Sequence, residues 1–456
     1  MKLRTTVIYA AMLGAGIGLF LLIRLAGQSL LAGGAATPAA RGVSVPGTDA
    51  VLTHVLFALV VIIVAARALG AAFARIGQPP VVGEMIAGIL LGPSLLGRLA
   101  PGLSLHLFPA AVVPYLSVIS EAGIIVFMFL VGLDLDTKLL KERTQASLAI
   151  SHASIVVPFV LGAALALRLY PAFSTGNVSF TVFALFMGVA MSVTAFPVLA
   201  RILTDRGMRQ SQTGTIALAC AAADDVTAWC LLALLVSVAR ARPGYALATI
   251  ALTAGFILVI FLLVRPAAAW FARRKAAGAE MTQTTLVIVC AALLLGALAT
   301  ERIGIHALFG AFLMGVVVPH DSALARGIRA KLEDPVVALP LPVFFAFTGL
   351  RTEVGLVHSL GNWLICALIV VVASVGKFGG SAAAARLVGL SWRQAAELGI
   401  LMNTRGLVEL IVLNIGLDLG VLSPTLFAML VLMAIVTTLA TTPVLQAVAR
   451  GSQPPA

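Results

Sequence analysis

Long apolar runs separated by short polar segments repeat along the whole chain. Each run is about twenty residues long, which is enough for an α-helix to cross the hydrocarbon core of a bilayer. The polar/apolar alternation of a transmembrane β-barrel does not occur. We therefore predict an all-α polytopic membrane protein with about thirteen core transmembrane helices after an N-terminal helix or signal. The core spans are centred near residues 60, 88, 125, 157, 190, 226, 256, 291, 312, 343, 371, 407 and 434.

The composition agrees with this interpretation and limits the choice of partners. Hydrophobic residues make up 61% of the chain and charged residues only 11%, so most of its surface suits membrane lipid. The net charge of +12 comes mainly from basic residues in short loops between the predicted spans, and most of these loops lie on the cytoplasmic side in the predicted topology. This is the positive-inside bias, not one basic face, so we expect no nucleic-acid partner. We expect a multi-pass protein of the cell (inner or plasma) membrane with a cytoplasmic C-terminus.

The ends of the chain and its connecting segments differ from the apolar spans. Residues 1–31 carry basic residues before an apolar stretch, which fits either a membrane anchor or a cleaved signal peptide. Residues 32–50 are rich in Gly, Ala and Pro and predict a flexible linker. We expect a connecting helix and basic loop at 241–280. The tail at 449–456 is short, so we expect no soluble regulatory domain there.

An internal repeat divides the chain into two halves. Residues 75–90 match residues 302–317 at a constant offset of 227 residues, with shared Arg, Ile and Gly positions. One span later, residues 126–136 match residues 343–353 at an offset of 217. The first member of each pair begins on the opposite side of the membrane from the second, so the repeat is inverted. Inverted repeats are typical of secondary transporters, with the binding site near the midplane. The predicted repeats are residues 51–240 and 281–448.

Two predicted spans are interrupted at corresponding positions of these halves. In the first, Pro197 cannot donate a backbone hydrogen bond, so the carbonyl of Val193 loses its helical partner. In the second, polar residues interrupt the run GILMNTRGLVEL. An unpaired carbonyl in hydrocarbon suits a chain that lines a wet cavity or binds an ion, although a simple proline kink also fits. We predict two unwound crossing helices that line a substrate site, with lining residues Ser192, Val193, Thr194, Asn403, Thr404 and Arg405.

Two adjacent carboxylates, Asp224 and Asp225, lie in the apolar run ACAAADDVTAWC. Neighbouring residues of an α-helix point about 100° apart, so the two carboxylates face different partners. We expect one to face an ion cavity and the other to face Lys377, which lies in a span of the other half. Such carboxylates titrate as a coupled pair. One site cannot readily hold a proton and a small cation together, so this competition, with alternating access, is sufficient for cation/proton exchange.

Four further ionisable residues lie within predicted spans, where each charge costs about 2.5–3.5 kcal/mol on insertion scales. Arg405 and Glu409 are four residues apart and can pair on one helical face, which we interpret as mainly structural. Glu84 is a candidate either to support the ion site or to gate access to it, and the sequence pattern does not decide between these two roles. Glu121 fits a polar contact between helices.

Three segments resemble the cation:proton antiporter-2 family, in particular the plant cation/proton exchangers and their bacterial relatives. They are SVTAFPVLARILTDRGM at 192–208, AAADDVTAW at 221–229 and NTRGLVELIVLNIGL at 403–417. The resemblance covers about residues 50–445. It implies an NhaA-like fold, a homodimer, and a core domain that moves against the dimer domain.

The resemblance also implies roles for individual residues. Asp225 and Asp224 would form the ion- and proton-binding pair for Na⁺ or K⁺. Asp225 would be the main binding carboxylate, and Asp224 would also bridge to Lys377. Many relatives carry Asn before the second Asp, whereas this chain carries Asp224. Two acids resemble the electrogenic members of the family, which suggests two protons per cation. The expected cargo is Na⁺ or K⁺ and H⁺, with no cofactor and no enzymatic activity.

Two other classes of transport protein remain open at this point. A Na⁺-coupled symporter for an organic anion shares this architecture and predicts a large amphipathic cavity. A channel would conduct far faster than a transporter. Oxygen ligands from carboxylates, hydroxyls and carbonyls suit Na⁺ and K⁺ alike, so the residues do not select the ion.

Overall fold

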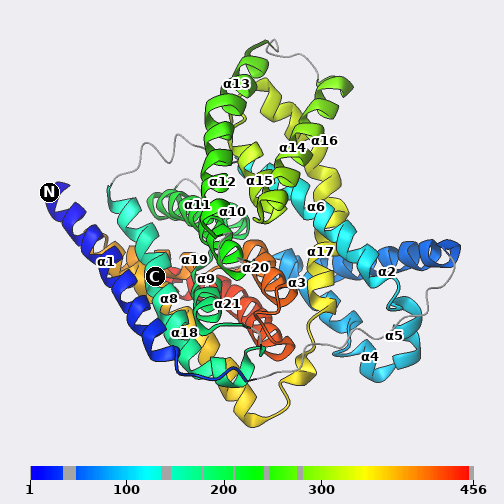
Figure 1. The fold of residues 1–456 in the computed structure, drawn as a ribbon, viewed down its shortest axis with the longest axis horizontal. Coiled ribbons are helices and arrows are strands. Elements are labelled where there is room, and N and C mark those ends of the chain that lie inside the picture. The colour runs from blue at the N-terminus through cyan, green and yellow to red at the C-terminus, as the bar shows by residue number, and fades with distance from the viewer. Residues whose placement is uncertain are drawn as a thin grey trace.

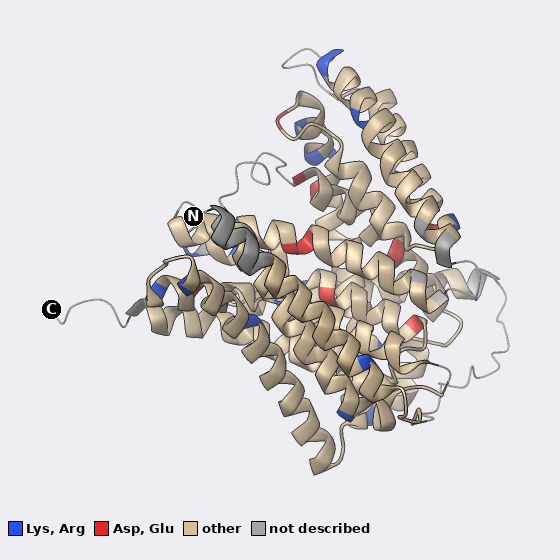
Figure 2. Ribbon diagram, turned by 60° about the vertical axis from the view of Figure 1, so that its left-hand side comes forward, with Lys and Arg blue, Asp and Glu red and all other residues tan. Residues whose placement is uncertain are grey.

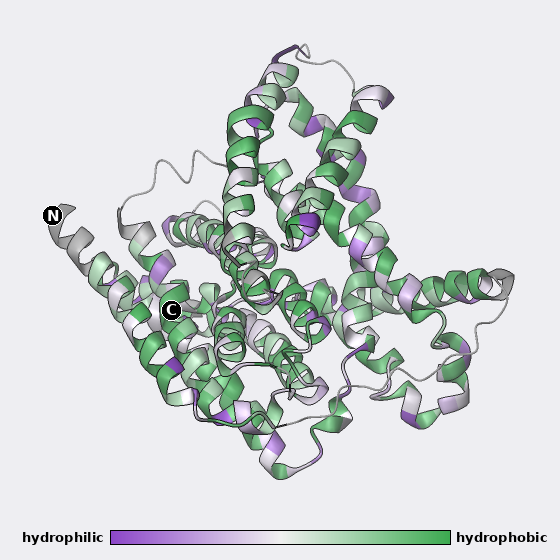
Figure 3. Ribbon diagram, in the orientation of Figure 1, coloured by the Kyte–Doolittle hydropathy of each residue, from purple (hydrophilic) through white to green (hydrophobic). Residues whose placement is uncertain are grey.

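A computed structural model describes residues 2–33, 48–134, 145–176, 178–208, 211–240, 246–274 and 281–450. Within these ranges the chain is helical and contains no strand. Apolar positions cover the helices along most of their length, and hydrophilic positions gather mainly near helix ends and loops (Figure 3). A helix satisfies its own backbone hydrogen bonds, as a segment in lipid must. The predicted all-α polytopic membrane fold is confirmed.

The lengths of the helices refine the predicted spans. In the described part of the chain, 11 helices are long and apolar enough to cross a membrane, or up to 12 if one bent pair counts as a span. Two shorter apolar helices, Phe180–Ser192 and Ala307–Val316, lie at the predicted centres near 190 and 312. The apolar pattern predicted the positions of these two segments. It did not predict that each helix is too short to cross a membrane by itself.

The helices form two groups, which we call the scaffold and the core. In Figure 1 the scaffold occupies the right and upper parts of the molecule and the core the lower left. The scaffold comprises α2 (Thr48–Arg75), α3 (Pro80–Leu91), α6 (Val113–Asp134), α14 (Gln283–Ile303), α15 (Ala307–Val316), α16 (Ala323–Ala338) and α17 (Pro340–Leu350). The core comprises α8 (Gln145–Phe173), α9 (Phe180–Ser192), α10 (Phe196–Asp205), α11 (Gln212–Arg240), α18 (Leu360–Leu387), α19 (Trp392–Met402), α20 (Leu407–Asp418) and α21 (Pro424–Arg450).

The remaining helices cover or connect these groups. Helix α1 (Lys2–Gly27) packs on α8, where the rings of Phe20 and Phe159 lie 5.6 Å apart. The predicted linker at 32–50, the basic loop before residue 281 and the tail at 449–456 lie largely outside the described residues. The connecting elements are α4 (Leu96–Leu99), α5 (Pro101–Leu107), α12 (Ala246–Val259), η1 (Ile260–Val264), α13 (Arg265–Arg274) and η2 (Val354–Leu356).

Glycines allow the scaffold helices to approach each other at two related places. A Cβ atom on Gly88 would collide with the backbone carbonyl of Ala346, so α3 and α17 touch closely there. A Cβ atom on Gly315 would collide in the same way with the carbonyl of Phe129, where α15 meets α6. Small residues permit such backbone contact in membranes. The partners are related by the same offsets of 227 and 217 residues as the sequence repeat. The reciprocal contacts are Gly349 with Met85 and Gly132 with Phe312.

Candidate functional site: a crossing of two broken helices

Both interrupted spans are broken helices, and their breaks meet. Helix α9 ends at Ser192 and α10 begins at Phe196. Helices α19 and α20 are separated by Asn403 to Gly406 and bend by 43°. The amide of Ala195 donates to the carbonyl of Thr404 at 3.0 Å, which joins one break to the other. The predicted interruptions are therefore in contact at the centre of the core.

Two buried cations cover the carbonyl end of α9. The guanidinium of Arg405 donates to the carbonyls of Ala190 and Met191, each at 2.8 Å. Lys377 donates to the next carbonyl, that of Ser192, at 2.5 Å. The last carbonyls of a helix lack helical partners and carry partial negative charge, so cations stabilise them. Arg405 thus caps a half-helix, a role that its position in the sequence did not indicate.

Arg405 is held in this position from two further directions. Its guanidinium pairs with Glu409 at 3.3 Å, and both side chains are fully buried. Its backbone exchanges two hydrogen bonds with the hydroxyl of Thr438 on α21, at 3.1 and 2.8 Å. The predicted pairing of Arg405 with Glu409 is present, but Arg405 lies in the break before α20 and not on a helical face.

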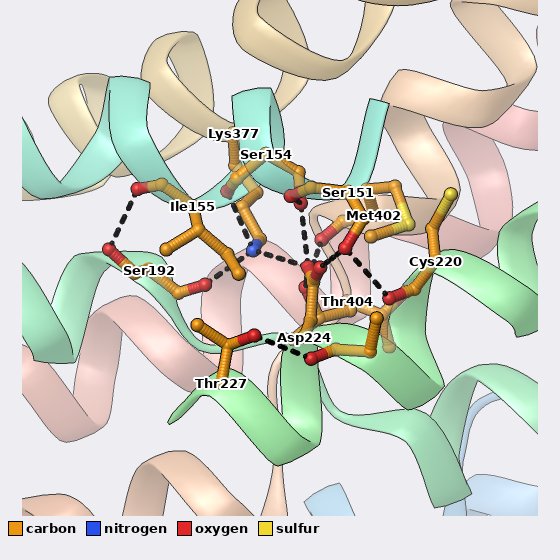
Figure 4. Close-up of polar contacts among 12 residues, drawn as sticks. Ser151, Ser154, Ile155, Ser192, Cys220, Asp224, Thr227, Lys377, Met402 and Thr404 are labelled. Atoms are coloured by element: carbon orange, nitrogen blue, oxygen red, sulfur yellow. Dashed lines mark hydrogen bonds and ion pairs between the residues drawn. The ribbon is translucent and has the colours of Figure 1, made fainter. Parts of the chain in front are cut away.

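Lys377 lies in the middle of α18 among acceptors from three other helices (Figure 4). Its ammonium is 3.2 Å from Oδ2 of Asp224 and donates to the carbonyl of Ser154 at 2.9 Å, in addition to that of Ser192. Neither Lys377 nor Asp224 is exposed. A buried ammonium has three donors to satisfy, and all three have acceptors here. The expected contact between Asp224 and Lys377 is present.

Asp224 receives three hydroxyl donors besides Lys377, and two of them, Ser151 and Ser154, are labelled in Figure 4. Ser151 donates to Oδ1 at 2.8 Å, and Ser154 and Thr194 donate to Oδ2 at 2.6 and 2.9 Å. Hydrogen bonds to a carboxylate are among the stronger ones in proteins, so this set holds Asp224 firmly. Sequence reasoning missed Ser151 and Ser154, because a serine in an apolar helix gives a weak signal. Their spacing of three residues, which puts both on one face of α8, was the only available indication.

Asp225 has a different environment from its neighbour. It is 1% exposed, and its Oδ1 has no hydrogen-bond partner among the described residues. The backbone amide of Phe196, at the start of α10, lies near this carboxylate. The N-terminal end of a helix carries partial positive charge and attracts anions. Asp225 therefore presents a buried carboxylate oxygen without a hydrogen-bond partner among the described residues.

A cavity of about 910 Å³ separates the scaffold from one end of the core. Its wall includes Phe196 and Leu407, the first residues of α10 and α20, so it reaches both broken helices. Glu84 lies in the same wall and is 7% exposed. The lining does not include Asp225 itself, but it includes the residue whose amide contacts Asp225. The cavity gives access to the neighbourhood of the site from one side.

On the side of the core away from this cavity, the pocket between core and scaffold is much smaller. The pocket there has a volume of about 40 Å³ and is bounded by Glu121 and Asn414, among others. Glu121 accepts a hydrogen bond from Ser117 on its own helix at 3.0 Å. The structure therefore groups Asp224, Asp225, Lys377, Arg405 and Glu409 in the core, and it puts Glu84 and Glu121 on the two access sides. Charged residues elsewhere lie mostly near helix ends (Figure 2).

Comparison with known proteins assigns the family. The family model described as sodium/hydrogen exchanger, transmembrane, matches residues 55–450. The chain belongs to this sodium/hydrogen exchanger family. The exchanger is 44% identical over 394 residues to the Na⁺/H⁺ antiporter NhaS4 of Synechocystis sp., which covers 86% of this chain and 96% of the relative. Membership confirms the predicted family and cation/proton exchange as its activity, in place of enzymatic catalysis or organic-anion symport.

More distant relatives also match most of this chain. It is 39% identical to cation/H⁺ antiporter 18 of Arabidopsis thaliana and 32% identical to K⁺/H⁺ antiporter 1 of Saccharomyces cerevisiae. These alignments cover 88% and 87% of this chain but only 49% and 46% of the relatives, so the chain spans about half their length. The fold matches the sodium proton antiporter MjNhaP1 from Methanocaldococcus jannaschii with a TM-score of 0.62 at 15% identity, over 88% of this chain and 98% of that one.

Proposed function

We propose that Asp225 is the carboxylate at which this exchanger swaps a monovalent cation for a proton. The observation that carries this proposal is its buried Oδ1 without a partner among the described residues, beside an Asp224 that has four donors. A buried anionic oxygen without a partner is costly, and either a proton or a cation removes that cost. Because one oxygen serves both, binding of one excludes the other, and the two fluxes become coupled.

Asp224 and Lys377 have a supporting role in this mechanism. Their contacts join α8, α9, α11 and α18 around the crossing, so they fix the position of the break next to Asp225. The unwound segments supply hydroxyl and carbonyl oxygens of the kind that binds Na⁺ or K⁺. The lining residues in this proposal are those of the two breaks, from Ser192 to Thr194 and from Asn403 to Arg405.

Exchange proceeds by alternating access of the core to the two sides. The cavity is lined by Arg67, Arg201 and Arg329, and the positive-inside rule assigns such residues to the cytoplasm. The described state is therefore inward-facing. The paired glycine contacts support an inverted repeat of residues 51–240 and 281–448, in which a rocking core produces an equivalent outward-facing state.

The cargo and the assembly are further parts of the proposal. The relatives include a Na⁺/H⁺ antiporter and a K⁺/H⁺ antiporter, so Na⁺ and K⁺ are the two cations to test. The exchanger acts as a homodimer in the cell membrane with its C-terminus in the cytoplasm. The pair of acids supports electrogenic exchange, whose reversal potential gives the number of protons per cation.

The decisive experiment uses purified protein in proteoliposomes with an imposed pH gradient and a trapped pH dye. Addition of Na⁺ or K⁺ should dissipate the gradient with wild-type protein. Asp225→Asn should abolish this response while the protein elutes as a single species at the wild-type volume. Cation-dependent proton movement that persists in Asp225→Asn would overturn the proposed role of Asp225. Wild-type protein that moves no protons with either cation would overturn the exchange proposal.

A further inference from the structure

On the side away from the large cavity, the core is joined to the scaffold by a small polar cluster. Arg351 follows the last residue of scaffold helix α17. Its guanidinium donates to Oδ1 of Asn414 at 3.0 Å through Nη1 and to Oδ1 of Asp418 at 2.5 Å through Nη2. Both acceptors belong to core helix α20. We call Arg351, Asn414, Asp418 and Thr348 the closed-side latch.

Asn414 is the central member of the closed-side latch. Its amide donates to the hydroxyl of Thr348 on α17 at 2.8 Å and to the carbonyl of Leu410 at 2.9 Å, while its oxygen accepts from Arg351. Asn414 is 9% exposed. Two of its three partners therefore lie across the boundary between core and scaffold. Movement of α20 away from α17 would leave a mostly buried amide without these partners until water replaced them.

Helix α20 connects this latch to the cation site. Its first residue, Leu407, lines the large cavity, and its last, Asp418, lies in the latch. Eleven helical steps separate them, which is about 16 Å along the axis. Glu409, in the first turn, pairs with the Arg405 that caps α9. A rigid movement of α20 thus changes the cavity wall and the latch together.

We infer that the closed-side latch sets the balance between the two access states, with Arg351 as its positioning residue. This inference rests on the proposed alternating-access function. In this inference, outward opening separates α20 from α17 and so breaks the latch contacts. Weakening these contacts shifts the population toward the outward-facing state. The size of the shift is set by the free energy with which the contacts stabilise the inward-facing state relative to the outward-facing one.

The contacts of the latch differ in expected strength. The side chains of Arg351 and Asp418 are 24% and 55% exposed, so water screens their ion pair. The contact between Arg351 and Asn414 is better protected. Asn414→Ala should therefore shift the balance more than Asp418→Asn does. Arg351→Lys keeps the charge but loses the forked geometry, so its effect should fall between those of wild type and Arg351→Gln.

The first test measures conformation and does not require transport. Ser120 lines the small closed-side pocket and is 2% exposed. Ser120→Cys, in a background with the four native cysteines replaced by Ala, reports access to a membrane-impermeant maleimide. Arg351→Gln should raise the labelling rate about tenfold, which corresponds to 1.4 kcal/mol. Arg302→Gln is the matched control, because it removes a cation from the end of α14 without touching the latch.

The second test measures transport separately from each side in oriented proteoliposomes. Arg351→Gln should lower the apparent KM for a cation supplied on the latch side and raise it on the cavity side. Unchanged labelling, or an equal increase in the Arg302→Gln control, would overturn the latch. Labelling that responds as expected in a protein without any cation/proton exchange would support the latch as a gate and reject only the proposed function. Monodisperse elution of every variant excludes misfolding as the cause.

Discussion

Two neighbouring carboxylates of α11 occupy opposite kinds of environment. Asp224 is surrounded by donors, three hydroxyls and one ammonium, from α8, α18 and the break between α9 and α10. Asp225 faces the beginning of α10, with one oxygen that has no partner among the described residues. A single step along a helix, about 100° of rotation, separates a fixed structural charge from an available one. The comparison teaches that two equally buried carboxylates can differ in their donors, and this difference is the basis of the role proposed for Asp225.

Removal of the available charge gives the largest expected effect. Asp225→Asn keeps the size of the side chain but removes the charge that a proton and a cation share. Exchange measured by pH-dye quenching in proteoliposomes should fall at least about 100-fold, because no exchangeable charge remains. Thermal stability should stay equal to wild type or rise, since a buried charge disappears. A fall in melting temperature with exchange intact would reverse the roles given to the two aspartates.

Removal of the fixed charge should mainly affect stability. Asp224→Asn leaves the buried ammonium of Lys377 without its counter-ion, and breaking one partner of a buried pair costs about 3–5 kcal/mol. The melting temperature in detergent should therefore fall well below that of Asp225→Asn. The double variant Asp224→Asn with Lys377→Met should recover part of this loss. If the double variant is as unstable as the sum of the two single ones, Asp224 and Lys377 are not coupled.

Removal of a single hydroxyl donor to Asp224 should cause a smaller loss of stability than removal of the Asp224 charge. Ser151→Ala and Ser154→Ala should each destabilise the protein by about 1–3 kcal/mol, because each removes a donor to a buried carboxylate. Thr227→Ala is the matched control, since the hydroxyl of Thr227 bonds, among the described residues, only to the carbonyl of Ala223 on its own helix, at 2.8 Å. Differential scanning fluorimetry in detergent compares the three variants. Equal effects in all three would show that the donors of Asp224 have no special weight.

Proton competition at Asp225 gives the smallest effect and needs no substitution. When protons and cations bind one carboxylate, acidification raises the apparent cation KM by up to about tenfold per pH unit and leaves the maximal rate unchanged. Above the pH at which the site is mostly deprotonated, KM should become constant. Initial rates over a series of cation concentrations at each pH measure this. A maximal rate that falls with acidification at constant KM would indicate separate sites.

Much of this site was predictable, because lipid makes polar residues informative. Charges and helix breaks are costly in hydrocarbon, so Asp224, Lys377 and the interruption at Pro197 stand out in the sequence. The helical rotation between adjacent residues predicted that the two aspartates face different partners. The family resemblance then assigned Asp224 to Lys377.

The remaining features depend on contacts between distant segments. Ser151 lies 73 residues from Asp224, and serine is common in apolar helices without such a partner. Arg405 was read as the partner of Glu409, whereas it also caps a helix 214 residues away. The role of Asn414 depends on the contact between α20 and α17, which the sequence pattern does not show. The short length of α9 and α15 also escaped prediction, because an apolar run does not reveal where a helix stops.

Proton release on cation binding tests the central claim most directly. Purified exchanger in weakly buffered detergent solution, near the pH where Asp225 is partly protonated, receives Na⁺ or K⁺, with choline as the inert control. Wild-type protein should release protons as it binds the transported cation, Asp225→Glu should still release them, and Asp225→Asn should release none. Equal release from Asp225→Asn and wild type would contradict the account, because the shared carboxylate would then lie elsewhere.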